Sequence, residues 1–177
     1  HAHYDDDAFD EDREQLLSSL QENGIEYVIN VGASLKSTAS TIELTKRYPF
    51  IYGAAGVHPS ETAELNEENF KWLAQQCRQS KIVAVGEIGF DFHWDATTKE
   101  GQMKSFLRQI WIARKNNLPI KNRYLSSFIT SKNGYLINED NYLEIVKPYI
   151  SNYFTNDFYD EILSDEIEVS ENIKLNA

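Results

Sequence analysis

The sequence predicts an α/β fold, with a parallel β-sheet and flanking helices over about its first 120 residues. Short apolar runs that end in glycine or proline recur along this part, and a segment with helical periodicity follows each of them. Strands that alternate with helices in this way indicate βαβ units. Right-handed crossovers would wind such units either into a barrel or into an open, doubly wound sheet.

Each predicted element has its own local signal. The first helix begins with acidic side chains, places Leu16, Leu17 and Leu20 on one face and stops at Gly24. Ser34 is a plausible N-cap of the second helix, and the last helix buries Phe106 on an apolar face. The predicted helices span residues 9–24, 34–49, 66–80 and 98–117, and the predicted strands span 27–32, 50–59, 81–91 and 118–120.

Residues 121–177 do not continue this rhythm. They are rich in aromatic residues and in Asn and Ser, and their last third is strongly acidic. We therefore predict two parts, the region of alternating strands and helices at 1–120 and a divergent, acidic and aromatic-rich C-terminal extension at 121–177. "KNG" at 132–134 suggests a hairpin turn within that extension.

Composition sets limits on function. The net charge of −11 argues against broad electrostatic binding of a phosphate backbone, so a nucleic-acid enzyme would depend on bound cations. The single cysteine, Cys77, forms no disulfide framework and is expected to be a small packing residue. No run of 18 apolar residues and no leader pattern occurs, which favours a soluble cytoplasmic protein without a membrane partner.

Several polar residues lie where predicted strands end, which is where α/β sheets bind ligands. His1 and His3 stand two residues apart, so on an extended segment both imidazoles face one ion, although chance often produces this spacing. Glu87 ends an apolar strand, where its charge needs a metal ion or a partner unless it is simply exposed past the strand. Gly86 and Gly89 would let the backbone approach it closely.

His58 follows another strand, and a hydrogen bond to a backbone carbonyl would explain this histidine equally well. Asp91 could hydrogen-bond to a ligand from just outside the site. His93 and Asp95 lie further into the same loop, and Trp94 beside them could stack on a base or cap the end of a barrel. The shared position of His1, His3, His58 and Glu87 at strand ends favours a metal site.

Five segments resemble the first half of the TatD family, in order and in spacing: "HAHYDDDAFDEDR", "YVINVGASLKS", "RYPFIYGAAGVHPSE", "IVAVGEIGFDFHWD" and "FLRQIWIARKNNLPI". These proteins are metal-dependent deoxyribonucleases with a TIM-barrel fold related to the amidohydrolases. The resemblance covers about residues 1–120 and implies a partial (β/α) TIM-barrel-like sheet. It also implies phosphodiester hydrolysis with DNA as the substrate.

The resemblance implies roles for single residues. His1 and His3 match the first two metal ligands of the family. Glu87 matches the carboxylate that bridges two divalent ions, which makes it both a metal ligand and the expected catalytic residue. His58 and Asp91 match residues that line the site. The expected cofactors are Mg²⁺, Mn²⁺ or Zn²⁺, two ions in the family or fewer here.

The later metal histidine and the closing aspartate of the family have no counterpart in residues 121–177, because all four histidines lie within residues 1–93. Impaired catalysis is therefore one expectation, and the alternative is an inactive TatD-derived protein that acts as an interaction module. An amidase or lactonase of the wider superfamily is disfavoured by "GEIGFDFHWD". A half barrel would leave open edges and an apolar face, which self-association could cover.

Overall fold

The structure, a computed structural model, describes residues 1–91 and 97–122. The chain divides into two compact units, His1–Leu136 and Ile137–Ala177, and every described residue belongs to the first. The predicted hairpin and the C-terminal extension beyond residue 122, together with His93, Trp94 and Asp95, lie outside the described residues. The predicted boundary after residue 120 stays a prediction.

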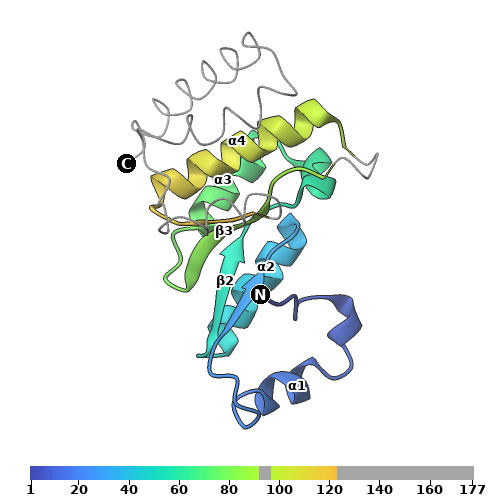
Figure 1. The fold of residues 1–177 in the computed structure, drawn as a ribbon, viewed down its shortest axis with the longest axis vertical. Helices are drawn as coiled ribbons and strands as arrows, with labels where there is room; N and C mark the ends of the chain where they lie inside the picture. Colours follow the sequence, from blue (N-terminus) through green and yellow to red (C-terminus); the bar gives the residue numbers. More distant parts are fainter. Residues whose placement is uncertain (92–96, 123–177) are drawn as a thin grey trace. The chain divides into compact units, whose positions relative to one another are not determined.

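The described part alternates helices and strands as the sequence predicts (Figure 1). The short 3-10 helices are η1 (Asp7–Phe9) and η2 (Pro59–Glu64). The α-helices are α1 (Arg13–Ser19), α2 (Leu35–Arg47), α3 (Glu67–Gln76) and α4 (Lys99–Lys115). The strands are β1 (Val28–Val31), β2 (Ile51–Ala55), β3 (Ile82–Ile88) and β4 (Ile120–Asn122).

All four strands are parallel and lie side by side in the order β1-β2-β3-β4. Helix α2 packs against β1 and β2, and α4 packs against β3. Because each new strand joins on the same side of the previous one, the sheet is singly wound, whereas a doubly wound sheet reverses its direction. Of the two windings that the sequence left open, the structure therefore has the one that belongs to a barrel.

The local signals largely hold. The Ser34 and Thr98 side chains cap α2 and α4 by accepting hydrogen bonds from the backbone N–H groups of Ser37 and Gly101. The first helix spans only Arg13–Ser19 because turns replace helix at both ends of the predicted segment, and the turns that follow it end at Gly24, which has a φ of +81°.

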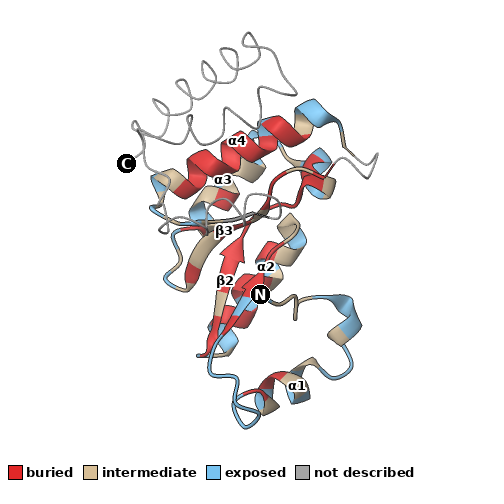
Figure 2. Ribbon diagram, in the orientation of Figure 1, coloured by how far each residue is buried: buried red, intermediate tan, exposed pale blue. Residues whose placement is uncertain are grey.

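The core lies between the sheet and the helices (Figure 2). Leu17 and Leu20 pack with Leu44 of α2 and Ile51 of β2 in one cluster of buried side chains. Helix α4 is buried along most of its length, including Phe106. Cys77 is buried, and burial raises the pKa of its thiol to about 12, as fits a packing residue. No helix among the described residues is long and apolar enough to cross a bilayer.

Candidate metal centre

The His1–His3 segment runs beside the end of β1 as an extended stretch. The Ala2 N–H donates to the Ile29 carbonyl at 2.9 Å, and the Val31 N–H donates to the Ala2 carbonyl at 2.9 Å. This parallel bridge pairs Ala2 with Asn30. Side chains alternate along an extended backbone, so His1 and His3 share one side, and their ring centroids lie 5.1 Å apart.

A backbone carbonyl orients the His3 ring. The distance between His3 Nδ1 and the Val31 carbonyl oxygen is 2.8 Å. A carbonyl oxygen can only accept, so Nδ1 carries the proton, and the Nε2 atom of the neutral ring keeps a lone pair for a ligand. Metal-binding histidines commonly have this arrangement, with the second ring nitrogen held by an acceptor.

Glu87 reaches the same place from β3. Its N–H donates to the Gly32 carbonyl at 2.9 Å. The successive carbonyls of Val31 and Gly32 thus hold the His3 ring and the Glu87 backbone. One nitrogen from each histidine and one Glu87 carboxylate oxygen all lie within 4.8 Å of one another. Among the described residues this group is the one whose donor types and spacing suit a metal ion.

Gly86 and Gly89 allow a close approach of backbone to Glu87, as the sequence indicated, and Gly56 contributes to the same close approach. A β-carbon built on Gly56 would lie 2.7–2.8 Å from the backbone N, Cα and C atoms of Gly86. Gly89 has a φ of +141°, a conformation that other residues rarely adopt. The backbones at the ends of β2 and β3 therefore meet without a side chain between them.

His58 is placed at the carboxyl end of β2 but does not join the three-residue group. It is buried, its N–H donates to the Ala33 carbonyl at 2.8 Å, and its side chain caps η2. The Nδ1 atom lies 2.9 Å from the Ser60 hydroxyl. A local side-chain hydroxyl thus engages this ring nitrogen.

Asp91 follows β3 and is buried, and the side chain of Gln102 holds its backbone. Its N–H donates to the Gln102 side-chain oxygen at 2.9 Å, and its carbonyl accepts from the Gln102 amide at 2.8 Å. Gln109, two turns further along α4, holds Val57 in the same two-bond manner at 2.8 and 3.0 Å. Two buried glutamines thus hold the backbone of Val57, which precedes His58, and the backbone of Asp91.

Gln102 and Gln109 were not among the residues expected from the sequence, although their position on an apolar helix face indicates a structural role. Gln102 and Gln109 share the face of α4 that holds Phe106, and an amide on a buried face requires partners. Asn30, within the otherwise apolar run "YVINVG", carried the same signal.

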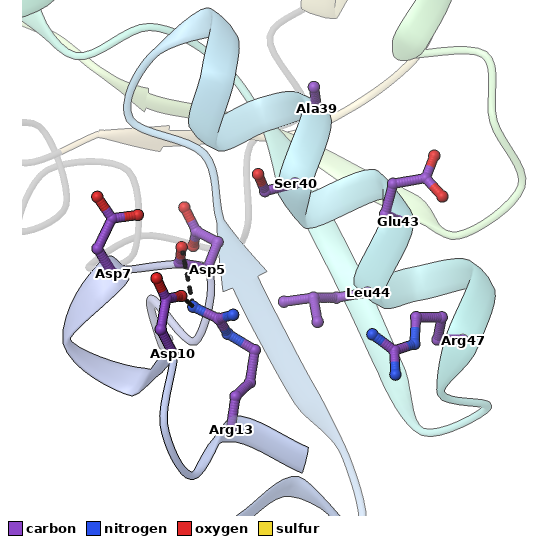
Figure 3. A pocket seen from close by; sticks show the side chains of 9 residues that line it. All are labelled: Asp5, Asp7, Asp10, Arg13, Ala39, Ser40, Glu43, Leu44 and Arg47. Carbon is purple, nitrogen blue, oxygen red and sulfur yellow. Dashed lines mark hydrogen bonds and ion pairs between the residues drawn. The ribbon is translucent and has the colours of Figure 1, made fainter.

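A cavity of about 390 Å³ lies beside the first loop, between residues 5–13 and α2. Figure 3 shows Arg13 reaching toward Asp10 on one wall, with Glu43, Leu44 and Arg47 of α2 on the other. The Arg13 guanidinium donates to Asp10 at 2.6 Å and to the Tyr4 and Asp6 carbonyls at 2.6 and 2.7 Å. The lining includes none of His1, His3 and Glu87, so this cavity is separate from the metal-ligand group.

A singly wound parallel sheet with two histidines and a glutamate at its carboxyl edge is the arrangement of a partial TIM barrel with a candidate metal site. The family model described as "TatD related DNase" matches residues 1–121. The chain belongs to this family, as its first-half motifs predicted.

Known proteins agree with this assignment. The chain is 34% identical over 120 residues to the uncharacterized metal-dependent hydrolase YabD of Bacillus subtilis. The alignment covers 68% of this chain and 47% of that protein. It is 27% identical over 112 residues to the 3'-5' ssDNA/RNA exonuclease TatD of Escherichia coli. That alignment covers 63% of this chain and 43% of that protein. The chain thus spans somewhat less than half the length of these relatives.

Solved structures show the same fold. The TatD homologue YJJV of Escherichia coli aligns with a TM-score of 0.62 at 30% identity, over 68% of this chain and 47% of that one. A TatD family hydrolase from Entamoeba histolytica aligns with a TM-score of 0.61 at 23% identity, over 88% of this chain and 55% of that one.

Proposed function

We propose that this chain is a divalent-metal-dependent hydrolase that cleaves phosphodiester bonds in DNA. The observation that carries the proposal is the convergence of His1, His3 and Glu87 within 4.8 Å at the carboxyl edge of the sheet. Family membership supports the reaction class, and relatives named as ssDNA/RNA exonucleases support nucleic acid as the substrate class.

The residues present fit a divalent cation. Two imidazole nitrogens and one carboxylate oxygen suit Zn²⁺ or Mn²⁺, and Mg²⁺ would rely more on the carboxylate and on water. The His3 ring is already oriented with its Nε2 lone pair available, because Val31 accepts from Nδ1. His1 is exposed and His3 is partly buried, so the group is accessible from solvent on the side of His1.

His1 and His3 would hold the ion, and Glu87 of β3 would hold it as ligand and catalytic carboxylate. A bound divalent ion supplies Lewis acidity and lowers the pKa of a coordinated water. His58 and Asp91 would line the site at neighbouring strand ends, kept in place by their contacts with Ser60 and Gln102. The net charge of −11 also makes a bound cation necessary for a phosphate substrate to approach.

A second candidate is a TatD-derived protein without catalysis that acts as an interaction module. The observation that favours it is the distribution of histidines, all within residues 1–93, where the family takes further ligands from its second half. Self-association belongs to either candidate, because Ile25 and Tyr27 are exposed just before the edge strand β1 and Ile29 is exposed within it.

Calorimetric titration of the metal-stripped full chain with Mg²⁺, Mn²⁺ and Zn²⁺ tests the proposal, and each ion that binds is then assayed on single-stranded DNA. We expect Glu87→Gln to weaken metal binding by at least about tenfold and to abolish cleavage, since it removes a charged ligand at nearly constant shape. Glu68→Gln, on the exposed face of α3, is the matched control and should match the wild type.

Metal binding without cleavage would select the interaction module. No binding of any of the three ions, or binding that Glu87→Gln leaves unchanged, would overturn the metal centre.

A further inference from the structure

The segment that carries His1 and His3 is attached to β1 by few contacts. Its main chain pairs with β1 at Ala2 alone. The next attachment comes from a side chain, because the Tyr4 N–H donates to Asn30 Oδ1 at 2.6 Å. Asn30 therefore holds the backbone on the far side of His3 from the Ala2 bridge.

Asn30 is fully buried and uses both ends of its carboxamide. Its Nδ2 atom donates to Asp5 Oδ1 at 2.7 Å and to the Thr41 hydroxyl at 2.7 Å. The Tyr4 N–H can only donate and the Asp5 carboxylate can only accept, so these partners determine which end of the amide is oxygen. The side chain has a single orientation that satisfies its surroundings.

The network continues from Asp5 to α2. The Ser37 hydroxyl donates to Asp5 Oδ2 at 2.5 Å and accepts from the Ala33 N–H at 3.1 Å. Asp5 is thereby held between β1 and the first turn of α2. Both residues that directly follow His3 are thus bonded to Asn30, one through its backbone and one through its carboxylate.

We propose that Asn30 is a positioning residue that orders the His1–His3 segment for metal binding. This inference rests on the metal centre proposed above. The hydrogen bonds of the Asn30 side chain go to Tyr4, Asp5 and Thr41 in the described part of the chain, so Asn30 acts on the histidines through Tyr4 and Asp5. Groups that orient metal ligands from outside the coordination shell typically change metal affinity by about 10- to 100-fold when they are removed.

The chemistry of the network requires an amide at this position. Leucine has a similar size but would leave the Tyr4 N–H and one Asp5 oxygen without their partner. Aspartate would place a second carboxylate against Asp5. Asp5→Asn would keep an acceptor for Asn30, but it would present an N–H group to Ser37, whose hydroxyl donates to Asp5 Oδ2 and would lose this acceptor.

The test compares Asn30→Leu, Asp5→Asn and the milder Ser37→Ala with the wild-type full chain. Thr45→Val is the matched control, because Thr45 is a buried residue of α2 whose hydroxyl bonds only within that helix, to the Ile42 carbonyl. Amide hydrogen exchange at Ala2 and Tyr4 is measured without metal, and Mn²⁺ affinity is measured by calorimetry. Urea unfolding of each variant gives its global stability.

We expect Asn30→Leu to speed exchange at Ala2 and Tyr4 and to weaken Mn²⁺ binding by about tenfold or more. Ser37→Ala should change both in the same direction by a smaller factor, which keeps the test valid if Asn30→Leu does not fold. Asp5→Asn should also change both in this direction, because it removes the carboxylate oxygen that accepts from Ser37, and only Thr45→Val should retain wild-type exchange and affinity. An affinity loss no greater than that of Thr45→Val would overturn the proposal, whatever the change in stability.

The two proposals fail in different ways. A wild-type chain that binds no Mn²⁺, Mg²⁺ or Zn²⁺ overturns the metal centre, and the positioning role for a metal with it. A wild-type chain that binds Mn²⁺ while Asn30→Leu leaves both exchange and affinity unchanged overturns the positioning role alone.

Discussion

Gly56 shows how single residues decide the geometry at the candidate metal centre. A β-carbon there would lie 2.7–2.8 Å from the backbone of Gly86, the residue before Glu87. Backbone atoms of a packed sheet cannot move aside as the end of a flexible side chain can. The absence of a side chain at Gly56 is therefore a condition for the position of Glu87.

We predict that Gly56→Ala lowers the free energy of unfolding by about 1–3 kcal/mol because of overpacking. It should also weaken Mn²⁺ binding, since relief of the contact would displace Gly86 and Glu87. Urea denaturation and calorimetry measure the two effects. Gly101→Ala adds the same methyl group in the first turn of α4, where it meets only the Thr98 hydroxyl at 3.0 Å, and it should leave metal affinity unchanged.

At the scale of elements, α4 does more than cover the sheet. The side chains of Gln102 and Gln109 bond to both backbone groups of one residue each, Asp91 and Val57, in the two loops at the carboxyl edge. Gln102 also donates to the Thr97 hydroxyl at 2.9 Å, and Thr97 in turn donates to the Pro59 carbonyl at 2.8 Å. Helix α4 thereby joins the loop after β2 to the loop after β3.

We predict that Gln109→Leu costs about 2–4 kcal/mol of stability, because a buried N–H and a buried carbonyl of Val57 would each lose a partner. The loss should appear in urea unfolding, with faster amide exchange at Val57. Gln75→Leu, on an exposed face of α3, should change stability by less than about 0.5 kcal/mol. Equal effects of the two variants would contradict the role given to Gln109.

At the scale of the whole molecule, the sheet ends at β1 in the described residues, beyond which only the Ala2 bridge pairs. Ile25, Tyr27 and Ile29 are 39%, 68% and 45% exposed, and Tyr27 and Ile29 flank the buried Val28, which places these two on the same side of the chain. Such an apolar row beside an edge strand favours association.

We predict that sedimentation velocity shows concentration-dependent self-association of the full chain. A double variant, Tyr27→Lys with Ile29→Lys, should shift it toward the monomer, because two charges on this row would have to be desolvated in an interface. Arg78→Glu, at an exposed site near the end of α3, is the control for a change of surface charge. Unchanged association of the lysine variant would contradict the assignment of this surface.

The sequence by itself determined the alternation of strands and helices, the helix cap at Ser34, and the candidate ligands His1, His3 and Glu87. These follow from local periodicity and from residue types that carry their chemistry wherever they stand. Only the tertiary structure decided that the sheet is singly wound, that His3 and Glu87 meet at Val31 and Gly32, and that His58 stays outside the ligand group. It also revealed Asn30, Gln102 and Gln109, because the partners of a buried amide lie far along the chain and become neighbours only when strands and helices pack.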